Sequence, residues 1–241
     1  MESYNAKRNI DSPIKSKLDW NNSDDNLAKK SKAKRNSIGL SDVDTADARL
    51  ESLKMDLNIV RANFEASNNG YIYIGQLVEG KKEGKGIIKN PNGDVIYDGF
   101  FRNDLYEGEG ILKLDNGLIY SGNFLKGKRN GRGNLFSNED KYRYEGEWLD
   151  DQKSGRGTET YPDNSCYCGE FLNNKRNGKG DYYLNDGSIY QGEFTDDKIE
   201  GYGKLTWTEN RVYEGQWKNN CIHGFGIFVK NDKIYIGKIK I

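Results

Sequence analysis

Apolar residues and glycines alternate with polar residues from residue 73 to residue 239, as in the run Tyr144-Glu145-Gly146-Glu147-Trp148. Because successive residues of a β-strand point to opposite faces of a sheet, Tyr144, Gly146 and Trp148 share one face and the two glutamates share the other. The run recurs with its tyrosine at positions 73, 97, 120, 144, 167, 190, 213 and 235, and a Gly-x-Gly pair begins 11 residues after each of the first seven. A fixed period of 22 to 24 residues predicts stacked repeats.

Each repeat is predicted to be a β-hairpin, and consecutive hairpins to continue as a meander. The second strand reads Gly-x-Gly-x-apolar, as in Gly131, Gly133 and Leu135, although Glu159 breaks this rule in the fourth repeat. Glycine inside a strand is unfavourable, so its recurrence indicates that aromatic rings lie over these positions. Asn-Gly and Asp-Gly pairs at 92–93, 116–117 and 186–187 predict type I′ turns.

The pattern Y-x-G-x-[FW]-x6-G-x-G over residues 73–239 resembles the MORN repeat, whose name stands for membrane occupation and recognition nexus. The resemblance implies an all-β fold: an elongated, single-layer, twisted antiparallel β-meander over residues 70–241. We expect its aromatic side chains to line a groove that binds a helix or an extended segment of a partner protein. The expected groove residues are Tyr97, Phe101, Tyr120, Phe124, Tyr144, Trp148, Tyr167, Phe171, Tyr190, Phe194, Tyr213 and Trp217.

Residues 42–66 change to a period of three and four, which predicts one amphipathic helix with an a/d seam. This helix has three alternative partners for its seam: the repeat sheet of its own chain, a second copy in a coiled coil, or another protein. The seam residues are Val43, Ala46, Leu50, Leu53, Leu57, Val60 and Phe64.

Residues 1–41 are polar and show no apolar periodicity, so we expect a disordered tail. Five positive charges lie close together within it, and two interpretations stay open: a contact with anionic lipid or an acidic partner, or a solvated linker. Ser37 follows this cluster as a candidate phosphorylation site. The cluster consists of Lys29, Lys30, Lys32, Lys34 and Arg35.

The composition of the chain limits the classes of partner and the cellular compartment that we expect. The chain has 241 residues with 37 basic and 37 acidic side chains, so its net charge of +0 gives no reason to expect a nucleic-acid partner. No apolar run reaches the length of about 20 residues that a membrane-spanning helix needs. Three cysteines without framework spacing are typical of a reducing compartment, and we expect a cytoplasmic protein.

Catalytic and metal-binding constellations are not predicted. His223 is the only histidine, and other repeats carry varied polar residues at its position, so we interpret it as a turn residue. Cys166 and Cys168 flank Tyr167, but Cys221 lies two repeats further on. We therefore expect no cofactor, no metal and no enzymatic activity.

The preferred hypothesis is a non-catalytic scaffold in a ciliary or axonemal assembly, such as a radial spoke, or in the cortical cytoskeleton. The alternative is a peripheral membrane adaptor that binds anionic phospholipid through the repeats and residues 29–35. A homodimer is a further hypothesis, formed through the C-terminal edge strand around Ile234 and Ile236 or through the 42–66 helix.

Overall fold

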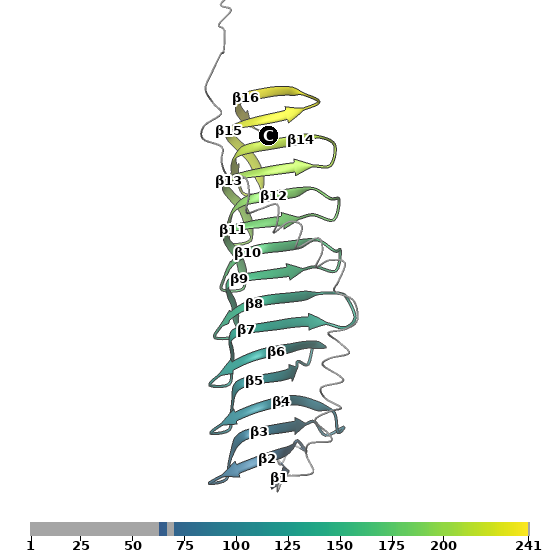
Figure 1. The fold of residues 1–241 in the computed structure, drawn as a ribbon, viewed down its shortest axis with the longest axis vertical. Coiled ribbons are helices and arrows are strands. Elements are labelled where there is room, and N and C mark those ends of the chain that lie inside the picture. The colour runs from purple at the N-terminus through teal and green to yellow at the C-terminus, as the bar shows by residue number, and fades with distance from the viewer. Residues whose placement is uncertain (1–62, 67–69, 241) are drawn as a thin grey trace, which may run out of the picture. The chain divides into compact units, whose positions relative to one another are not determined.

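The computed structural model describes residues 63–66 and 70–240, which form a single sheet of 16 antiparallel strands in chain order. Figure 1 shows the strands stacked one above another, from β1 at the bottom to β16 at the top. The strands are β1 (Asn63–Ala66), β2 (Ile72–Val78), β3 (Lys81–Lys89), β4 (Val95–Arg102), β5 (Leu105–Lys113), β6 (Leu118–Leu125), β7 (Lys128–Ser137), β8 (Arg143–Leu149), β9 (Gln152–Thr160), β10 (Cys166–Leu172), β11 (Lys175–Tyr183), β12 (Ile189–Thr195), β13 (Lys198–Trp207), β14 (Arg211–Lys218), β15 (Cys221–Lys230) and β16 (Lys233–Lys240).

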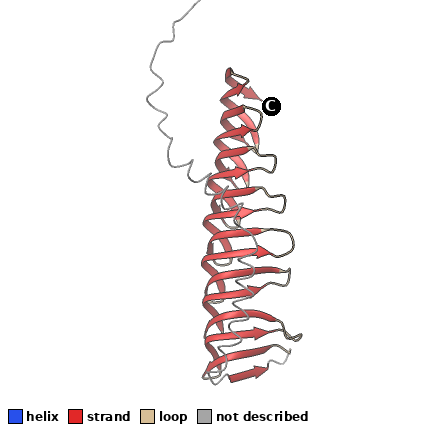
Figure 2. Cartoon of the chain, turned by 45° about the vertical axis from the view of Figure 1, so that its right-hand side comes forward, coloured by secondary structure: helices blue, strands red, loops and turns tan. Residues whose placement is uncertain are grey.

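The predicted all-β antiparallel meander is confirmed, because each strand from β2 onward pairs with its neighbours in sequence and each repeat supplies one hairpin. The described residues contain only strands and loops (Figure 2), so none of them forms a helix that could cross a membrane.

A continuous row of glycines runs across the sheet and sets its register. Gly75 faces Gly86, Gly86 faces Gly99, and Gly99 faces Gly110. The same pairing continues to Gly226 and Gly237 in the last two strands. Neighbouring strands are therefore in register at glycine, the one residue type without a side chain, and this leaves space above the backbone.

The repeat tyrosines fill the space above this row. A Cβ atom placed on Gly146 would lie 2.5 Å from the hydroxyl of Tyr144, and one on Gly157 would lie 2.7 Å from it. The Tyr144 ring thus covers two glycines on neighbouring strands, as the sequence predicts. Six of these tyrosines, one in each repeat from the second to the seventh, have no exposed surface: Tyr97, Tyr120, Tyr144, Tyr167, Tyr190 and Tyr213.

The first glycine of each Gly-x-Gly pair has a different role. Gly155 has a φ of 71°, a left-handed conformation that favours glycine, and it lies where a β-bulge shifts the register between Gly146 and Trp148. The Tyr144 hydroxyl donates a hydrogen bond to the carbonyl of Glu147 inside this bulge, at 2.8 Å. The same bond recurs in all seven repeats, so the tyrosine satisfies a carbonyl that the bulge takes out of the ladder.

The predicted type I′ turns at the Asn-Gly and Asp-Gly pairs are wrong. Only the glycine of each pair has a positive φ, and Gly93 donates its N–H to the carbonyl of Asn90, which is the geometry of a type I turn followed by a left-handed glycine. Two-residue turns with positive φ at both positions lie instead inside the repeats, for example at Asn103 and Asp104, with φ of 48° and 68°. Both turn classes contain Asn and Gly, so composition alone does not separate them.

The end of the predicted 42–66 helix is corrected by the structure. Asn63–Ala66 forms β1, which pairs with β2 and places Phe64 opposite Ile74. An unpaired β2 would leave a row of backbone donors and acceptors without partners, and strand pairing satisfies them. Residues 42–62, the tail over residues 1–41, its basic cluster and Ser37 lie outside the described residues.

Candidate functional site

The twelve expected groove residues form the core of the sheet. Each is at most 6% exposed, so a partner cannot rest directly on these rings. Tyr120 shows the packing: Phe124 of its own strand lies edge-on at 5.0 Å, and Trp148 of the next repeat lies edge-on at 5.3 Å. Each ring is enclosed by the rings of neighbouring repeats, and edge-to-face contacts of this kind stabilise aromatic pairs.

A second set of side chains surrounds this core, and we call the surface they form the aromatic face. Trp207 is typical: it is half-buried, packs against the core and lies edge-on to Phe228 at 6.1 Å. These residues lie outside the Y-x-G-x-[FW] pattern that supplied the expected groove residues, although Tyr182 and Phe228 occupy the apolar position of Gly-x-Gly-x-apolar. The half-buried aromatic members are Tyr106, Tyr142, Tyr161, Tyr182, Trp207 and Phe228.

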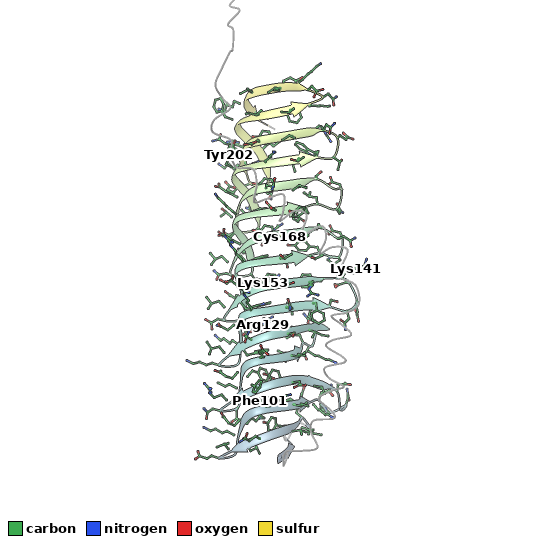
Figure 3. The ribbon with its side chains drawn as sticks, viewed as in Figure 1. Phe101, Arg129, Lys141, Lys153, Cys168 and Tyr202 are labelled. Carbon is green, nitrogen blue, oxygen red and sulfur yellow. The ribbon has the colours of Figure 1, made fainter. Side chains whose placement is uncertain are left out.

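Cations lie over the core rings at one position of the repeat, nine residues after the tyrosine. The Arg129 guanidinium lies 4.4 Å from the centre of the Trp148 ring, and Lys153 Nζ lies 4.9 Å from the centre of the Tyr144 ring. In Figure 3, Arg129 and Lys153 lie one above the other in the middle of the sheet, whereas Lys141 lies in a loop at its edge. Cation–π contacts of this kind hold a charge against an apolar surface.

The same position joins each repeat to the next. The backbone N–H of Arg129 donates to the Asp151 carboxylate at 2.9 Å, and the Asp151 N–H donates back to the Arg129 carbonyl at 3.0 Å. Ile199 and Asn220 form the equivalent pair of bonds at 2.7 Å and 3.0 Å. The turn of one repeat is thereby attached to the second strand of the repeat before it.

The residue that breaks the repeat pattern, Glu159, lies in a buried polar cluster on the aromatic face. Its carboxylate forms an ion pair with Lys153 and accepts hydrogen bonds from the hydroxyls of Tyr142 at 2.8 Å and Tyr161 at 2.9 Å. Burial, and then the charge of Glu159, raises the pKa of both tyrosines well above the ordinary value. Both hydroxyls therefore stay protonated and can donate to the carboxylate.

The opposite face of the sheet has a different character. Its glutamates take part in the bulges: Glu147 accepts a hydrogen bond from the backbone N–H of Arg156 at 3.4 Å, and Glu193 accepts one from that of Tyr202 at 3.1 Å. The two glutamates thus bond to the backbone of the neighbouring strand. Tyr202 and Phe225 are exposed aromatic residues on this face.

The histidine and cysteines that the sequence singles out do not assemble into a metal site in the part of the chain that the structure describes. Cys166 and Cys168 lie with their sulfurs 4.0 Å apart, whereas Cys221 is exposed on a later strand. His223 lies within β15 rather than in a turn. Among residues 63–66 and 70–240, no three His, Cys, Asp or Glu side chains are grouped to hold an ion.

The model of the family described as MORN repeat matches seven segments, which together make up more than half of the chain. The segments are residues 73–95, 97–119, 120–140, 144–166, 167–189, 190–210 and 213–233. No curated protein matches the sequence.

Two similar solved structures are TCP domains bound to segments of partner proteins. One is the SAS-4 (dCPAP) TCP domain of Drosophila melanogaster in complex with a proline-rich motif of Ana2 (dSTIL), 13% identical with a TM-score of 0.36, covering 74% of this chain and 91% of that one. The other is the TCP10 domain of Danio rerio CPAP in complex with a peptide of Danio rerio STIL, 11% identical with a TM-score of 0.24, covering 71% of this chain and 80% of that one. These TM-scores are too low for either structure to bear on function.

Proposed function

Because the chain belongs to the MORN repeat family, we propose that it is a non-catalytic scaffold that binds a segment of a partner protein on its aromatic face. The observation that supports this proposal is the half-buried aromatic layer above the core. The core rings are already enclosed by one another, so the folding of the sheet does not require Tyr182 or Trp207 to be aromatic.

The chemistry of this layer suits protein recognition. Tyr, Trp and Arg are the residue types that most often carry binding energy at protein interfaces, because they combine a large apolar surface with hydrogen-bonding groups. On the aromatic face, Tyr142 and Tyr161 already donate their hydroxyls to Glu159, so their rings are held in place before a partner arrives. A fixed ring loses little conformational entropy on binding.

The proposal also includes a cellular setting, a homodimer and an alternative function at a membrane. The setting would be a ciliary, axonemal or cortical cytoskeletal assembly in the cytoplasm, which rests on the family resemblance alone. Homodimerisation would use β16, where Ile234 and Ile236 are 65% and 77% exposed. The membrane-adaptor alternative would use residues 29–35, which lie outside the described residues.

Site-specific photocrosslinking in cells of the chain's own species tests the scaffold proposal. The photoreactive residue p-benzoylphenylalanine replaces Tyr182 or Trp207 on the aromatic face, and Tyr202 or Phe225 on the opposite face as matched controls. All four positions are aromatic in the natural chain, so each replacement keeps a ring. We expect protein crosslinks from Tyr182 and Trp207 that are absent from the two controls.

Two results would overturn the scaffold proposal. One is equal crosslinking from both faces, which would show that the aromatic face has no special role. The other is crosslinking of the aromatic face to lipid alone, which would favour the membrane adaptor. The dimer is checked separately by light scattering of the purified full chain, with Ile234→Lys and Ile236→Lys expected to convert a dimer to a monomer.

A further inference from the structure

Two arginines on the aromatic face are held in place by contacts that occupy only part of each guanidinium. In Arg129, on β7, Nε donates to the Asp151 carboxylate and Nη2 donates to the Asp151 carbonyl, both at 3.0 Å. In Arg176, on β11, the same two nitrogens bond to the carboxylate and the carbonyl of Asp197 at 3.3 Å and 2.8 Å. Both guanidiniums also lie over core rings, with Arg176 5.6 Å from the centre of the Phe194 ring.

Each of these arginines keeps N–H groups that the bonds above do not use, and part of each side chain is accessible. A guanidinium has five N–H groups, and the bonds above use two of them. Within residues 70–240, Nη1 of Arg129 and Nη1 of Arg176 have no acceptor, and each side chain is 19% exposed. An arginine that is stacked and partly bonded loses little rotamer freedom when it binds a carboxylate through its free N–H groups.

The turns themselves do not require an arginine. Ile199 closes the equivalent turn with Asn220 through its backbone alone, at 2.7 Å, and Lys153 does so with Asn174 at 2.8 Å. The guanidiniums of Arg129 and Arg176 are therefore additional to what the fold needs. Each arginine is ion-paired with its aspartate but keeps unused N–H groups. Between them, the Lys153 ammonium is buried against Glu159 and also donates to the Tyr142 hydroxyl, so it offers a carboxylate no comparable pair of donors.

We propose that the aromatic face recognises an acidic segment of its partner protein, with one carboxylate against Arg129 and another against Arg176. The two arginines are four strands apart, about 19 Å at the usual strand spacing of about 4.8 Å. An extended segment rises about 3.3 Å per residue, so it would bridge them with acidic residues about six positions apart. This inference rests on the proposed scaffold function and adds the chemical class of the partner.

Peptide selection with the full-length chain tests the inference without knowledge of the natural partner. A displayed library of random 16-residue peptides is selected on the immobilised chain, and the affinities of selected peptides are measured by fluorescence anisotropy. We expect selected peptides to carry pairs of Asp or Glu. Arg129→Gln and Arg176→Gln should each weaken binding about tenfold, the loss of one charge-assisted hydrogen-bonded pair. Arg132→Gln and Arg156→Gln, on the opposite face, should leave binding unchanged.

A second measurement separates recognition from misfolding of a variant. Replacing one Glu by Gln in the peptide should weaken binding to the natural chain about tenfold, and it should have no further effect on the variant that lacks the matching arginine.

Three outcomes would overturn the acidic-segment inference. Peptides that bind the aromatic face without acidic residues and ignore both arginine variants would do so, although the scaffold proposal would then stand. Selected peptides that depend on no residue of the aromatic face would overturn both proposals. Binding to phosphatidylserine vesicles that the two arginine variants abolish, without any effect on peptides, would assign the arginines to a lipid surface instead.

Discussion

Gly146→Ala should strongly destabilise the sheet, because Gly146 lies directly under the ring of Tyr144. A Cβ atom at this position would lie 2.5 Å from the tyrosine hydroxyl and 2.7 Å from the Cα of Gly157. Neither neighbour can yield easily, since the backbone of Gly157 is paired in the sheet and the ring is held by its bond to Glu147. Of the two, the paired backbone is less able to shift, so the Tyr144 ring is displaced and its hydroxyl bond to Glu147 is lost.

The magnitude follows from two costs. Overpacking a close-packed core costs about 1–3 kcal/mol. Displacing the hydroxyl of Tyr144 also leaves the bulge carbonyl of Glu147 without its donor, which costs about 1 kcal/mol. Reduced freedom of the unfolded chain offsets about 0.4–1 kcal/mol of this. The expected loss in the free energy of unfolding is about 1–3.5 kcal/mol.

Gly237→Ala is the matched control, because Gly237 belongs to the same glycine row but has no atom within 4 Å of its added Cβ. It should leave the free energy of unfolding within about 0.5 kcal/mol of the natural chain, or raise it slightly. Urea unfolding followed by both circular dichroism and tryptophan fluorescence measures the difference, and the two probes detect partial unfolding of a repeat array. Equal effects of the two substitutions would refute the assignment of the glycine row to ring packing.

Three other predictions follow from the same structure. Tyr144→Phe should lower the free energy of unfolding by about 1 kcal/mol, since it removes one hydroxyl bond and keeps the ring; an unchanged urea midpoint would contradict this. Glu159→Leu should cost about 3 kcal/mol because it leaves Lys153 unpaired, whereas Glu159→Leu combined with Lys153→Ile should restore stability; a double variant as unstable as the single one would be evidence against a simple ion-pair effect. Burial raises the pKa of core tyrosines such as Tyr97 and Tyr120 above 10.0, so their contribution is present below pH 10 and is lost as the pH rises. The main rise in tyrosinate absorbance should therefore accompany loss of the sheet, after a smaller rise from exposed tyrosines such as Tyr71 and Tyr235. Ionisation of most of the tyrosines in an intact sheet would refute the prediction.

Burial of the aromatic rings could not be predicted from alternation. The pattern correctly places Tyr144 and Trp148 on one face, but a face of a single sheet is expected to be open to a partner. In the structure the Tyr144 ring is enclosed by Trp148 and by Phe171 from the next repeat, at 5.2 Å and 5.1 Å. The enclosing ring is 27 residues away in the chain, and its distance depends on how tightly successive hairpins stack.

The sequence marks Glu159 as exceptional but does not reveal which residues it contacts. It is visible as the one charged residue at an apolar position of the repeat, and alternation places it on the aromatic face. Lys153 lies on the same strand as Glu159, β9, whereas Tyr142 lies in the loop before β8 and Tyr161 in the loop after β9. Such a cluster can be identified only when the register between strands is known.

The sequence by itself determined the repeat, the antiparallel meander and the face to which each strand residue belongs, because a period of two and a period of about 23 residues are local properties of the chain. The tertiary structure decided which glycine of each pair lies under a ring and which has a positive φ, as Gly157 and Gly155 show. It also decided which aromatic residues remain accessible, and which cations keep free donors. These properties depend on contacts between residues one repeat apart, whose distances follow from bulges, turn geometry and the stacking of hairpins rather than from the order of side chains along the chain.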